Sequence, residues 1–563
     1  MKKLTLIIIA LTFVMINNLC GQNKSLANID EFITEYMESV NKPGLSACII
    51  KNDSIVWRGN YGYSNLEDSI LVTKDRQFNA YSIGKSITAA SIMNLWENGI
   101  IGLDENVNSF LPFQIDNPFF EYDSITPRML MTHRSSIKDF NIWNYVTIGD
   151  ATMTLAYFLE NYLSSDGEFY SNSNFFNYTP GSFYQYSNIG SALNGYLAEA
   201  LLDTLFKDYA KNSLLTPMQM ENSSWFFSEI NIDSLALGYS YELVPFPQYG
   251  HPAYPGLTLK TSSEELSHYA IMLMNGGKYI NNQVLEEATV DTMCTLQMNS
   301  ADWGLGLRRE ILQCANEDKI IWGHKGGSVN GFAAEVQFCR DEDIGVVYMS
   351  NSNPYANEVL KKLFEYAALI VIPEDATNIS DTGFTTHWQV APDAVEYYID
   401  IAYDSQFTTY VAGYQNLNTG LDTTVDVAGL DPGTEYFYRI KAYNSVDTGA
   451  YSQTNSQTTL INTYELHHQK TITEVIISPN PVSENATLFL NLASSGTIEI
   501  YIYNTSGICL KSRQYSAEKS GQNEFNINLK DIPAGIYFLQ VKALPFGRQA
   551  DNEMVTKKII KVK

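Results

Sequence analysis

Three short motifs carry the side chains in this sequence that are suited to acyl transfer. Ser82-Ile83-Gly84-Lys85 places an amine one helical turn after a hydroxyl, so both groups face the same side of a helix. A desolvated lysine can sit neutral and accept the proton of a neighbouring serine. Tyr186-Ser187-Asn188 and His324-Lys325-Gly326-Gly327 follow in that order. Together the motifs predict a serine nucleophile with basic partners.

Each of these motifs is short enough to recur by chance. Further matches to the first two begin at Ser135, Ser516, Tyr63, Tyr170 and Tyr355. Ser82 differs from the other serines because it stands where an irregular stretch gives way to an apolar-periodic helix, whose free N-terminal amides stabilise negative charge. Tyr186 follows Pro180-Gly181, and Tyr170 remains its main rival.

The elements that must position these residues belong to a mixed domain, residues 26–371. Strand patterns cover 45–51 and 54–58 near its start and 332–339 and 344–350 near its end. Helices are expected at 27–40, from Ser82 onward and at 358–368. Strands at both ends predict an α+β domain, in which one antiparallel sheet is assembled from the two ends and flanked by helices, with a helical lobe inserted.

The 563 residues are too many for one hydrophobic core, and after residue 373 the pattern changes to short alternating strands. This change predicts two all-β sandwich modules. Residues 376–460 resemble a fibronectin type III domain, with Trp388 as the core plug and Tyr436 in the place of the tyrosine corner. Residues 475–563 resemble the C-terminal sorting domain of the type IX secretion system, with another adhesive β-sandwich as the alternative.

The first 21 residues have the form of a secretory signal peptide, with Lys2-Lys3 before a short apolar run and Gly21 as the cleavage point. A lipid anchor at Cys20 is the minor alternative, because bulky Leu19 precedes that cysteine. With the sorting module, the signal predicts a secreted or cell-surface protein, exported through the periplasm and outer membrane. The type IX secretion machinery is then a partner, and no transmembrane segment is expected in the mature chain.

Composition excludes several other classes of function. Apolar residues at 45% and charged residues at 17% indicate folded protein. A formal net charge of −26 repels phosphate backbones, so nucleic acid is not an expected partner. Histidines and cysteines do not cluster at metal-ligand spacing, so we expect no metal and no cofactor. Whether Cys294 and Cys314 form a disulfide is left open.

The order of the motifs resembles the serine β-lactamase and penicillin-binding-protein superfamily, on the branch of class C β-lactamases, D-aminopeptidases and related esterases. Accessory stretches at 102–104, 125–137, 180–181 and 323–327 match as well. The resemblance implies that Ser82 is the acylated nucleophile, that Lys85 helps to deprotonate it and that Tyr186 is the shared general base and acid. Asn188 would hold the lysine and the substrate amide.

The resemblance also assigns the third motif. His324 would polarise Tyr186 or contact the substrate, and Gly326 would belong to the substrate-binding edge. The amides of Ser82 and Gly327 would form the oxyanion hole. Many relatives carry a lysine at the position of His324, and histidine is charged only part of the time near neutral pH. Lys325 should point away from the site, because neighbouring residues of a strand face opposite ways.

A second departure from the family pattern is Ser136, where relatives usually have glycine. This difference affects the shape of the loop rather than the chemistry. The sequence therefore predicts an exported serine hydrolase that acts through an acyl-enzyme on a small-molecule or peptide substrate, as a D-amino-acid peptidase or an esterase would. A true β-lactamase or D-Ala-D-Ala carboxypeptidase is the alternative, favoured less because His324 replaces a permanent cation. A catalytically silent surface binding protein is the alternative of another class.

Overall fold

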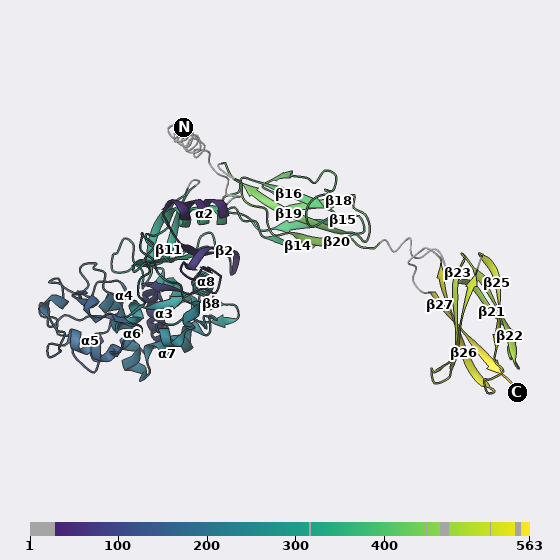
Figure 1. Cartoon of the computed structure of the whole chain (residues 1–563), viewed down its shortest axis with the longest axis horizontal. Coiled ribbons are helices and arrows are strands. Elements are labelled where there is room, and N and C mark those ends of the chain that lie inside the picture. The colour runs from purple at the N-terminus through teal and green to yellow at the C-terminus, as the bar shows by residue number, and fades with distance from the viewer. Residues whose placement is uncertain (1–28, 315–316, 446–447, 462–471, 518, 546–552) are drawn as a thin grey trace, which may run out of the picture. The chain divides into compact units, whose positions relative to one another are not determined.

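The computed structural model describes residues 29–314, 317–445, 448–461, 472–517, 519–545 and 553–563. The predicted signal peptide, residues 1–21, lies outside these ranges. Within them no helix is both long and apolar enough to cross a membrane. Figure 1 shows a mixed helix-and-strand domain followed by two modules built from strands, which confirms the predicted fold class.

A seven-stranded antiparallel sheet forms the centre of the mixed domain (Figure 1), in the order β10-β11-β12-β13-β1-β2-β3. Its strands are β1 (Gly44–Lys51), β2 (Ser54–Asn65), β3 (Ile70–Leu71), β10 (Arg308–Gln313), β11 (Asp318–Val329), β12 (Phe332–Cys339) and β13 (Ile344–Ser350). β1 pairs with β13, with Leu45 opposite Ser350. The two ends of the domain therefore meet in the middle of the sheet, as the sequence predicts.

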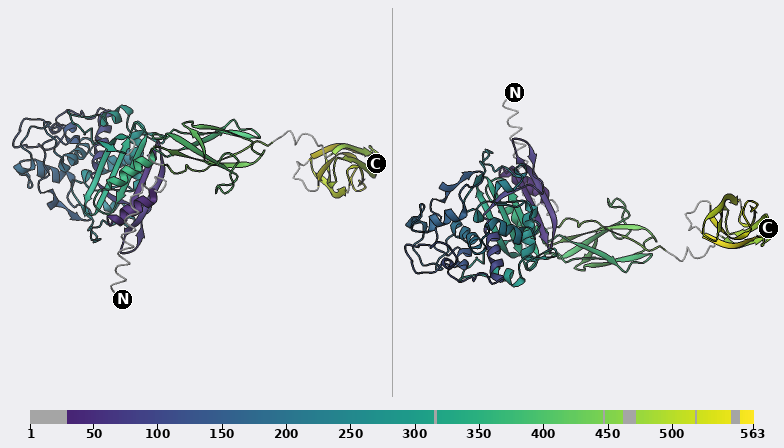
Figure 2. Two further views of the ribbon diagram at one scale, coloured as in Figure 1. Left: turned by 90° about the horizontal axis from the view of Figure 1, so that it is seen from above. Right: turned by 90° about the horizontal axis from the view of Figure 1, so that it is seen from below.

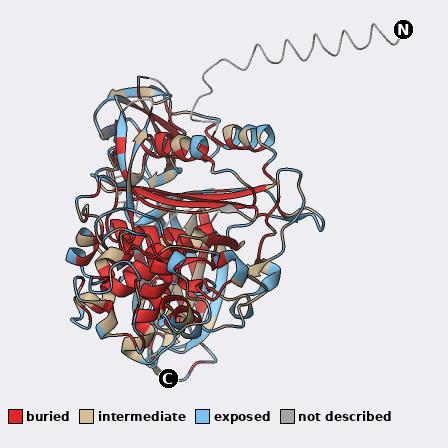
Figure 3. Cartoon of the chain, turned by 90° about the vertical axis from the view of Figure 1, so that its left-hand side faces the viewer, coloured by how far each residue is buried: buried red, intermediate tan, exposed pale blue. Residues whose placement is uncertain are grey.

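Both faces of the central strands are covered. Every residue of β1, β12 and β13 is buried, as the red strands in Figure 3 show. Near-continuous apolar strands are expected where helices cover a sheet on both sides. α8 (Ser263–Met274) packs against β1, β12 and β13, while α10 (Asn357–Ala367) contacts β1, β13 and α2 (Ile29–Ser39).

The inserted lobe is built around α3 (Gly84–Glu97) and α6 (Asn188–Leu202), which pack against each other. Most residues of both helices are buried, which marks them as central rather than surface helices. Figure 2 shows the helical segments grouped beside the sheet. The remaining helices are α4 (Pro127–Met131), α5 (Leu155–Leu163), α7 (Phe206–Ala210) and α9 (Glu287–Met293).

Four further short strands lie in the lobe, in two-stranded pairs. β4 (Phe78–Tyr81) pairs with β7 (Leu259–Thr261), and β5 (Thr147–Ile148) pairs with β6 (Tyr249–Gly250). β4 ends at the residue before Ser82, so this small ladder fixes the chain that leads into the first motif. A third pair joins β8 (Lys278–Tyr279) to β9 (Asn282–Gln283).

Each β module is a pair of sheets. The first has β14-β15-β18 and β17-β16-β19-β20, with Trp388 and Tyr436 buried as expected. Its strands are β14 (Pro373–Thr377), β15 (Gly383–Trp388), β16 (Glu396–Ala402), β17 (Leu417–Gly420), β18 (Thr424–Ala428), β19 (Glu435–Tyr443) and β20 (Asn455–Thr458).

The second module has β21-β22-β25 and β24-β23-β26-β27. Apolar residues from the two sheets form one core. Its strands are β21 (Ile472–Ser478), β22 (Asn485–Leu492), β23 (Gly496–Asn504), β24 (Cys509–Ala517), β25 (Gly521–Asn528), β26 (Gly535–Pro545) and β27 (Glu553–Lys561).

The structure differs from the sequence-based expectations at two element boundaries and answers the open question about Cys294 and Cys314. β2 extends to Asn65 rather than Arg58, because its pairing with β1 continues to Gly62 and its last residues pair with β3. The central helix begins at Gly84, two residues after Ser82. The five described cysteines are all free, so Cys294 and Cys314 are not joined.

Candidate active site

Ser82 and Lys85 meet where β4 turns into α3. The Lys85 Nζ lies 2.9 Å from the Ser82 Oγ and also donates to the Gly256 carbonyl. Tyr81, directly before the serine, has φ 45°, a left-handed conformation that is uncommon for a residue with a Cβ and is found at functional turns. The turn brings the serine hydroxyl over the first turn of the helix, within reach of the amine.

Burial changes the acidity of the amine. Lys85 is 3% exposed, and burial lowers its pKa to about 7, with the Asp139 carboxylate acting in the opposite direction. A substantial fraction of Lys85 is therefore neutral near pH 7, unlike an ordinary lysine. A neutral amine hydrogen-bonded to a serine hydroxyl can accept its proton.

Tyr186 reaches the same serine from the other side. Its hydroxyl is hydrogen-bonded to Ser82, and the Lys85 Nζ lies 5.0 Å from the centre of its ring. Burial raises the pKa of Tyr186, and the hydrogen bond with Ser82 opposes that rise. The residue as a whole is 37% exposed and lines the cavity beside the serine. Hydroxyl, amine and phenol thus lie together at one point.

Asn188 begins α6, and its partner is a carboxylate that the sequence did not single out. The Asn188 Nδ2 and backbone amide both donate to Asp139 Oδ2, at 2.7 and 2.8 Å. The Ile189 amide and the Ser187 hydroxyl donate to Asp139 Oδ1. Asp139 therefore holds the N-terminus of the helix that carries the second motif. The hydrogen bond from Asn188 to Lys85 that we expected is not among those of the described residues.

The third motif lies on β11, next to β12. An added Cβ at Gly326 would overlap the Ala80 carbonyl oxygen, so glycine allows β11 to run close beside the chain that carries the nucleophile. Gly327 has φ 96°, which also requires glycine. Gly327 lines the same cavity as Ser82, whereas Gly326 does not. No backbone acceptor is recorded for the Ser82 amide among the described residues.

His324 is neutral rather than partly charged, which corrects the expectation from its ordinary pKa. Burial and the nearby charge of Lys85 lower the pKa of His324 to about 3. Its Nδ1 lies 2.8 Å from the Lys325 carbonyl oxygen, which can only accept a hydrogen bond. The proton of the neutral ring is therefore on Nδ1, and Nε2 carries a lone pair.

The side chain of Lys325 points away from the site, as expected for its strand position. Its Nζ lies 3.0 Å from Glu310 and 3.5 Å from Glu335. Glu335 is directly opposite Lys325 on β12. The lysine thus ties β11 to its two neighbouring strands.

A cavity of about 190 Å³ opens beside the serine. Ser82, Tyr186, Asn188 and Gly327 line it, and segments from the middle of the chain complete its walls. The main rival of Tyr186 does not take part, because the Tyr170 hydroxyl donates to the Asp116 carbonyl instead. The candidate residues that do not line the cavity are Lys85, His324 and Gly326.

His133 supports the ring of Tyr186. The centres of the two rings are 4.4 Å apart, and the Ser187 amide donates to His133 Nδ1. His133 therefore accepts a hydrogen bond from the backbone that carries the second motif. Ser136, in the same loop, has φ 60°, the left-handed region that favours glycine.

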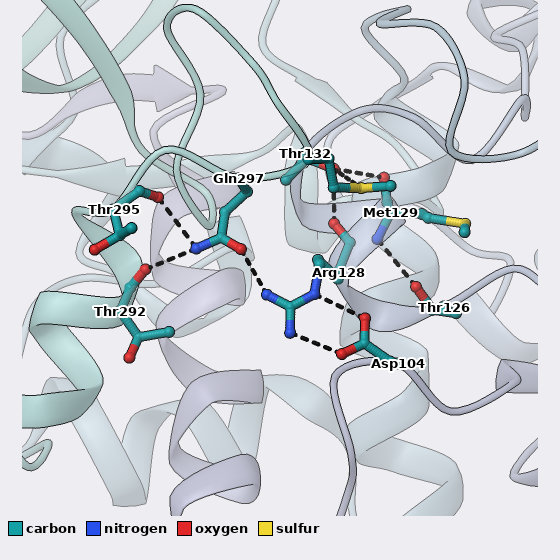
Figure 4. A network of polar contacts seen from close by, with 9 residues as sticks. Asp104, Thr126, Arg128, Met129, Thr132, Thr292, Thr295 and Gln297 are labelled. Carbon is teal, nitrogen blue, oxygen red and sulfur yellow. Dashed lines mark hydrogen bonds and ion pairs between the residues drawn. The ribbon is translucent and has the colours of Figure 1, made fainter.

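α4, which leads into this loop, is tied down by the network in Figure 4. Arg128 donates to both carboxylate oxygens of Asp104, at 2.7 and 2.8 Å, and to the side-chain oxygen of Gln297. Thr126 caps the helix by accepting from the Met129 amide. Residues from three distant parts of the chain therefore hold the loop beneath Tyr186 in place.

The comparison with protein families gives three matches that follow one another along the chain. The model of the beta-lactamase family matches residues 29–369, more than half of the chain. The chain belongs to the beta-lactamase family. In this family member, the model of the fibronectin type III domain matches residues 373–458. The model of the secretion system C-terminal sorting domain matches residues 477–562.

Curated relatives of this beta-lactamase family member are distant. Beta-lactamase-like protein 2 of Dictyostelium discoideum is 25% identical over 395 residues, 66% of this chain and 67% of that protein. Protein flp of Staphylococcus aureus strain N315 is 23% identical over 352 residues, 61% of this chain and 66% of that protein. The chain spans about two thirds of the length of these relatives.

A solved structure described as a class C beta-lactamase superposes with a TM-score of 0.50 at 20% identity, covering 60% of this chain and 94% of its own. This likeness concerns the fold. The sorting domain indicates export by the type IX system, to the cell surface or the medium.

The pKa of Lys85 predicts how activity of this family member depends on pH. Below about pH 7 the amine is protonated and cannot accept the serine proton; above it the amine is neutral. We expect kcat/KM for an ester to rise with pH, with a midpoint near 7, and to reach a plateau, because the pKa of Tyr186 is raised. A pH profile of kcat/KM measures this, and a rate that falls between pH 6 and 8 would contradict it.

Asp139→Asn should lower activity and move that profile. An amide cannot accept four hydrogen bonds from donors as the carboxylate does, so α6 loses its anchor and kcat/KM should fall about 10- to 100-fold. Removal of the negative charge lets the pKa of Lys85 fall further, so the midpoint should move to lower pH.

Asp116→Asn is the matched control for Asp139→Asn. Asp116 also accepts from a backbone amide, that of Ser165, but it does not perturb Lys85. This control should leave the midpoint unchanged. An Asp139→Asn profile with the wild-type midpoint would show that the carboxylate has only a structural role.

Proposed function

We propose that this chain is an exported serine hydrolase that transfers the acyl group of an ester or amide to Ser82 and then to water. The observation that carries the proposal is the convergence on one hydroxyl: the buried Lys85 amine lies 2.9 Å from Ser82 Oγ, and the Tyr186 hydroxyl bonds the same atom. A proton can leave the serine only where such an acceptor is present.

Acylation begins when the Ser82 proton passes to the neutral Lys85 amine and the serine oxygen attacks the substrate carbonyl. The resulting oxyanion is stabilised by the amides of Ser82 and Gly327, an arrangement worth about 3 kcal/mol per donor in other hydrolases. The Tyr186 phenol donates its proton to the leaving group and takes one back from the Lys85 ammonium. Water then attacks the acyl-Ser82 ester, its proton passes to neutral Lys85, and protonation of the departing serine oxygen regenerates Ser82.

Asn188 and His324 act around this centre rather than on the reacting proton. Asn188 borders the cavity and is oriented by Asp139, so it is placed to contact the substrate. Neutral His324 offers no permanent charge to a substrate carboxylate. This favours D-amino-acid peptidase or esterase chemistry over that of a β-lactamase or D-Ala-D-Ala carboxypeptidase.

Labelling of the purified full chain tests the proposal. A fluorescent fluorophosphonate should react, and peptide mapping by mass spectrometry should find the adduct on Ser82. A fluorescent penicillin, which carries a carboxylate, should label weakly or not at all. An unlabelled protein, or an adduct on another serine, would contradict the proposal and favour a silent binding protein.

A further inference from the structure

The cavity beside Ser82 has an uncharged lining. Its walls include Tyr81, Trp143, Val146, Tyr249, His251 and Leu257, and no Asp, Glu, Lys or Arg lines it among the described residues. An aromatic and aliphatic wall with a few polar atoms suits an apolar group. A carboxylate placed there would lose its hydration without gaining a partner of opposite charge.

His251, the one residue of this wall whose side chain can become a cation, is neutral, and both of its ring nitrogens are hydrogen-bonded to the backbone. Its Nε2 lies 2.9 Å from the Ile142 carbonyl oxygen, so this nitrogen carries the proton, and Nδ1 accepts from the Ala253 amide. Burial lowers the pKa of His251 to about 4. It therefore offers neither a charge nor a free donor to a bound anion.

Of the cations near the third motif, Arg308 and Lys325 are paired with carboxylates, and Lys85 is hydrogen-bonded to protein oxygens. Arg308 lies 3.0 Å from both Asp302 and Glu310. Lys325 is paired with Glu310 and Glu335. Lys85, beneath the cavity, is hydrogen-bonded to Ser82 and Gly256. The formal net charge of −26 adds long-range repulsion of anions.

The size of the cavity limits the group that enters it. Its volume of about 190 Å³ is somewhat larger than the roughly 150 Å³ of an engineered cavity that binds benzene. A single ring or a short aliphatic chain matches this space.

We propose that the substrate is an ester or amide without a carboxylate beside the scissile bond, and that it presents an uncharged group of about one ring to this cavity. The inference rests on the proposed function, because it names the substrate class of the same site. It makes the cavity wall a determinant of specificity, separate from the residues that move the proton.

Three matched esters test the charge preference: phenyl phenylacetate, phenyl 4-carboxyphenylacetate and 4-carboxyphenyl phenylacetate. The two analogues place one carboxylate on the acyl side or on the leaving-group side. We expect kcat/KM for the neutral ester to exceed that for each carboxylated ester by more than tenfold. Equal or faster turnover of either carboxylated ester, in protein that fluorophosphonate labels at Ser82, would overturn the inference and leave the proposed function standing.

A charge introduced into the wall gives the second arm. Val146→Lys should lower the ratio of kcat/KM for the neutral ester to kcat/KM for the carboxylated esters at least threefold, because the new ammonium can pair with the substrate carboxylate. Val146→Met introduces a side chain similar in length to lysine but uncharged, and it should keep the wild-type ratio. Fluorophosphonate labelling of Ser82 in both variants establishes that they are folded. A preference that Val146→Lys leaves unchanged would overturn the inference.

Discussion

Ser82→Ala is expected to lower ester turnover at least about 10⁴-fold and to abolish fluorophosphonate labelling. The hydroxyl is the atom on which the Lys85 amine and the Tyr186 phenol converge, and alanine leaves both without a nucleophile to activate. The effect should fall on kcat, because the cavity wall that binds the substrate is retained. Steady-state kinetics with the neutral ester measure it.

Ser135→Ala is the matched control for this change. Ser135 also begins a Ser-x-x-Lys sequence, but it does not line the cavity, and its hydroxyl accepts from the Ile137 amide. Its removal should leave labelling intact. Labelling that survives in Ser82→Ala and disappears in Ser135→Ala would place the nucleophile at the second serine.

Lys85→Arg is expected to lower kcat about 10³-fold, a typical loss when a positioned acid or base is removed. The reason is protonation rather than charge or size alone. Burial brings the pKa of Lys85 to about 7, whereas a guanidinium stays protonated at every accessible pH and cannot accept the serine proton. The pH profile should therefore lose its rise near pH 7.

Comparison with Lys85→Ala distinguishes the explanations. If the side chain acts as a base, arginine should be no better than alanine. If it acts only as a fixed cation, arginine should retain most of the activity, and the neutral-amine mechanism would be wrong. Thermal unfolding of both variants controls for loss of the fold, since the lysine is buried in the domain core.

The sequence predicts the central strands well and the edge of the sheet poorly. β12 and β13 have the expected bounds because their apolar runs are continuous and end at turns. β10 and much of β11 were not expected: β10 is short and rich in charged residues, and Gly323 and Gly326 in β11 have low strand propensity. Close contact with neighbouring backbone, rather than propensity, places glycine there.

The candidate site follows the same division between local and distant information. The spacing of Ser82 and Lys85 lies within one helical turn, so a motif alone brings them together. Asp139 and the Gly256 carbonyl come from loops far along the chain. Their local sequence does not predict that they bind Asn188 and Lys85. The neutral state of His324 likewise depends on burial, which only the folded chain reveals.

The pairing of β1 with β13 constrains how the mixed helix-and-strand domain can form. β1 can pair with β2 soon after both are made, but its other edge is filled only when β13 follows, where Leu45 lies opposite Ser350. Contacts so distant in sequence slow folding, because the entropy cost of closing a long loop comes before the contacts can stabilise the chain. A chain that is still being synthesised, or only partly translocated, therefore cannot complete the sheet until β13 has emerged.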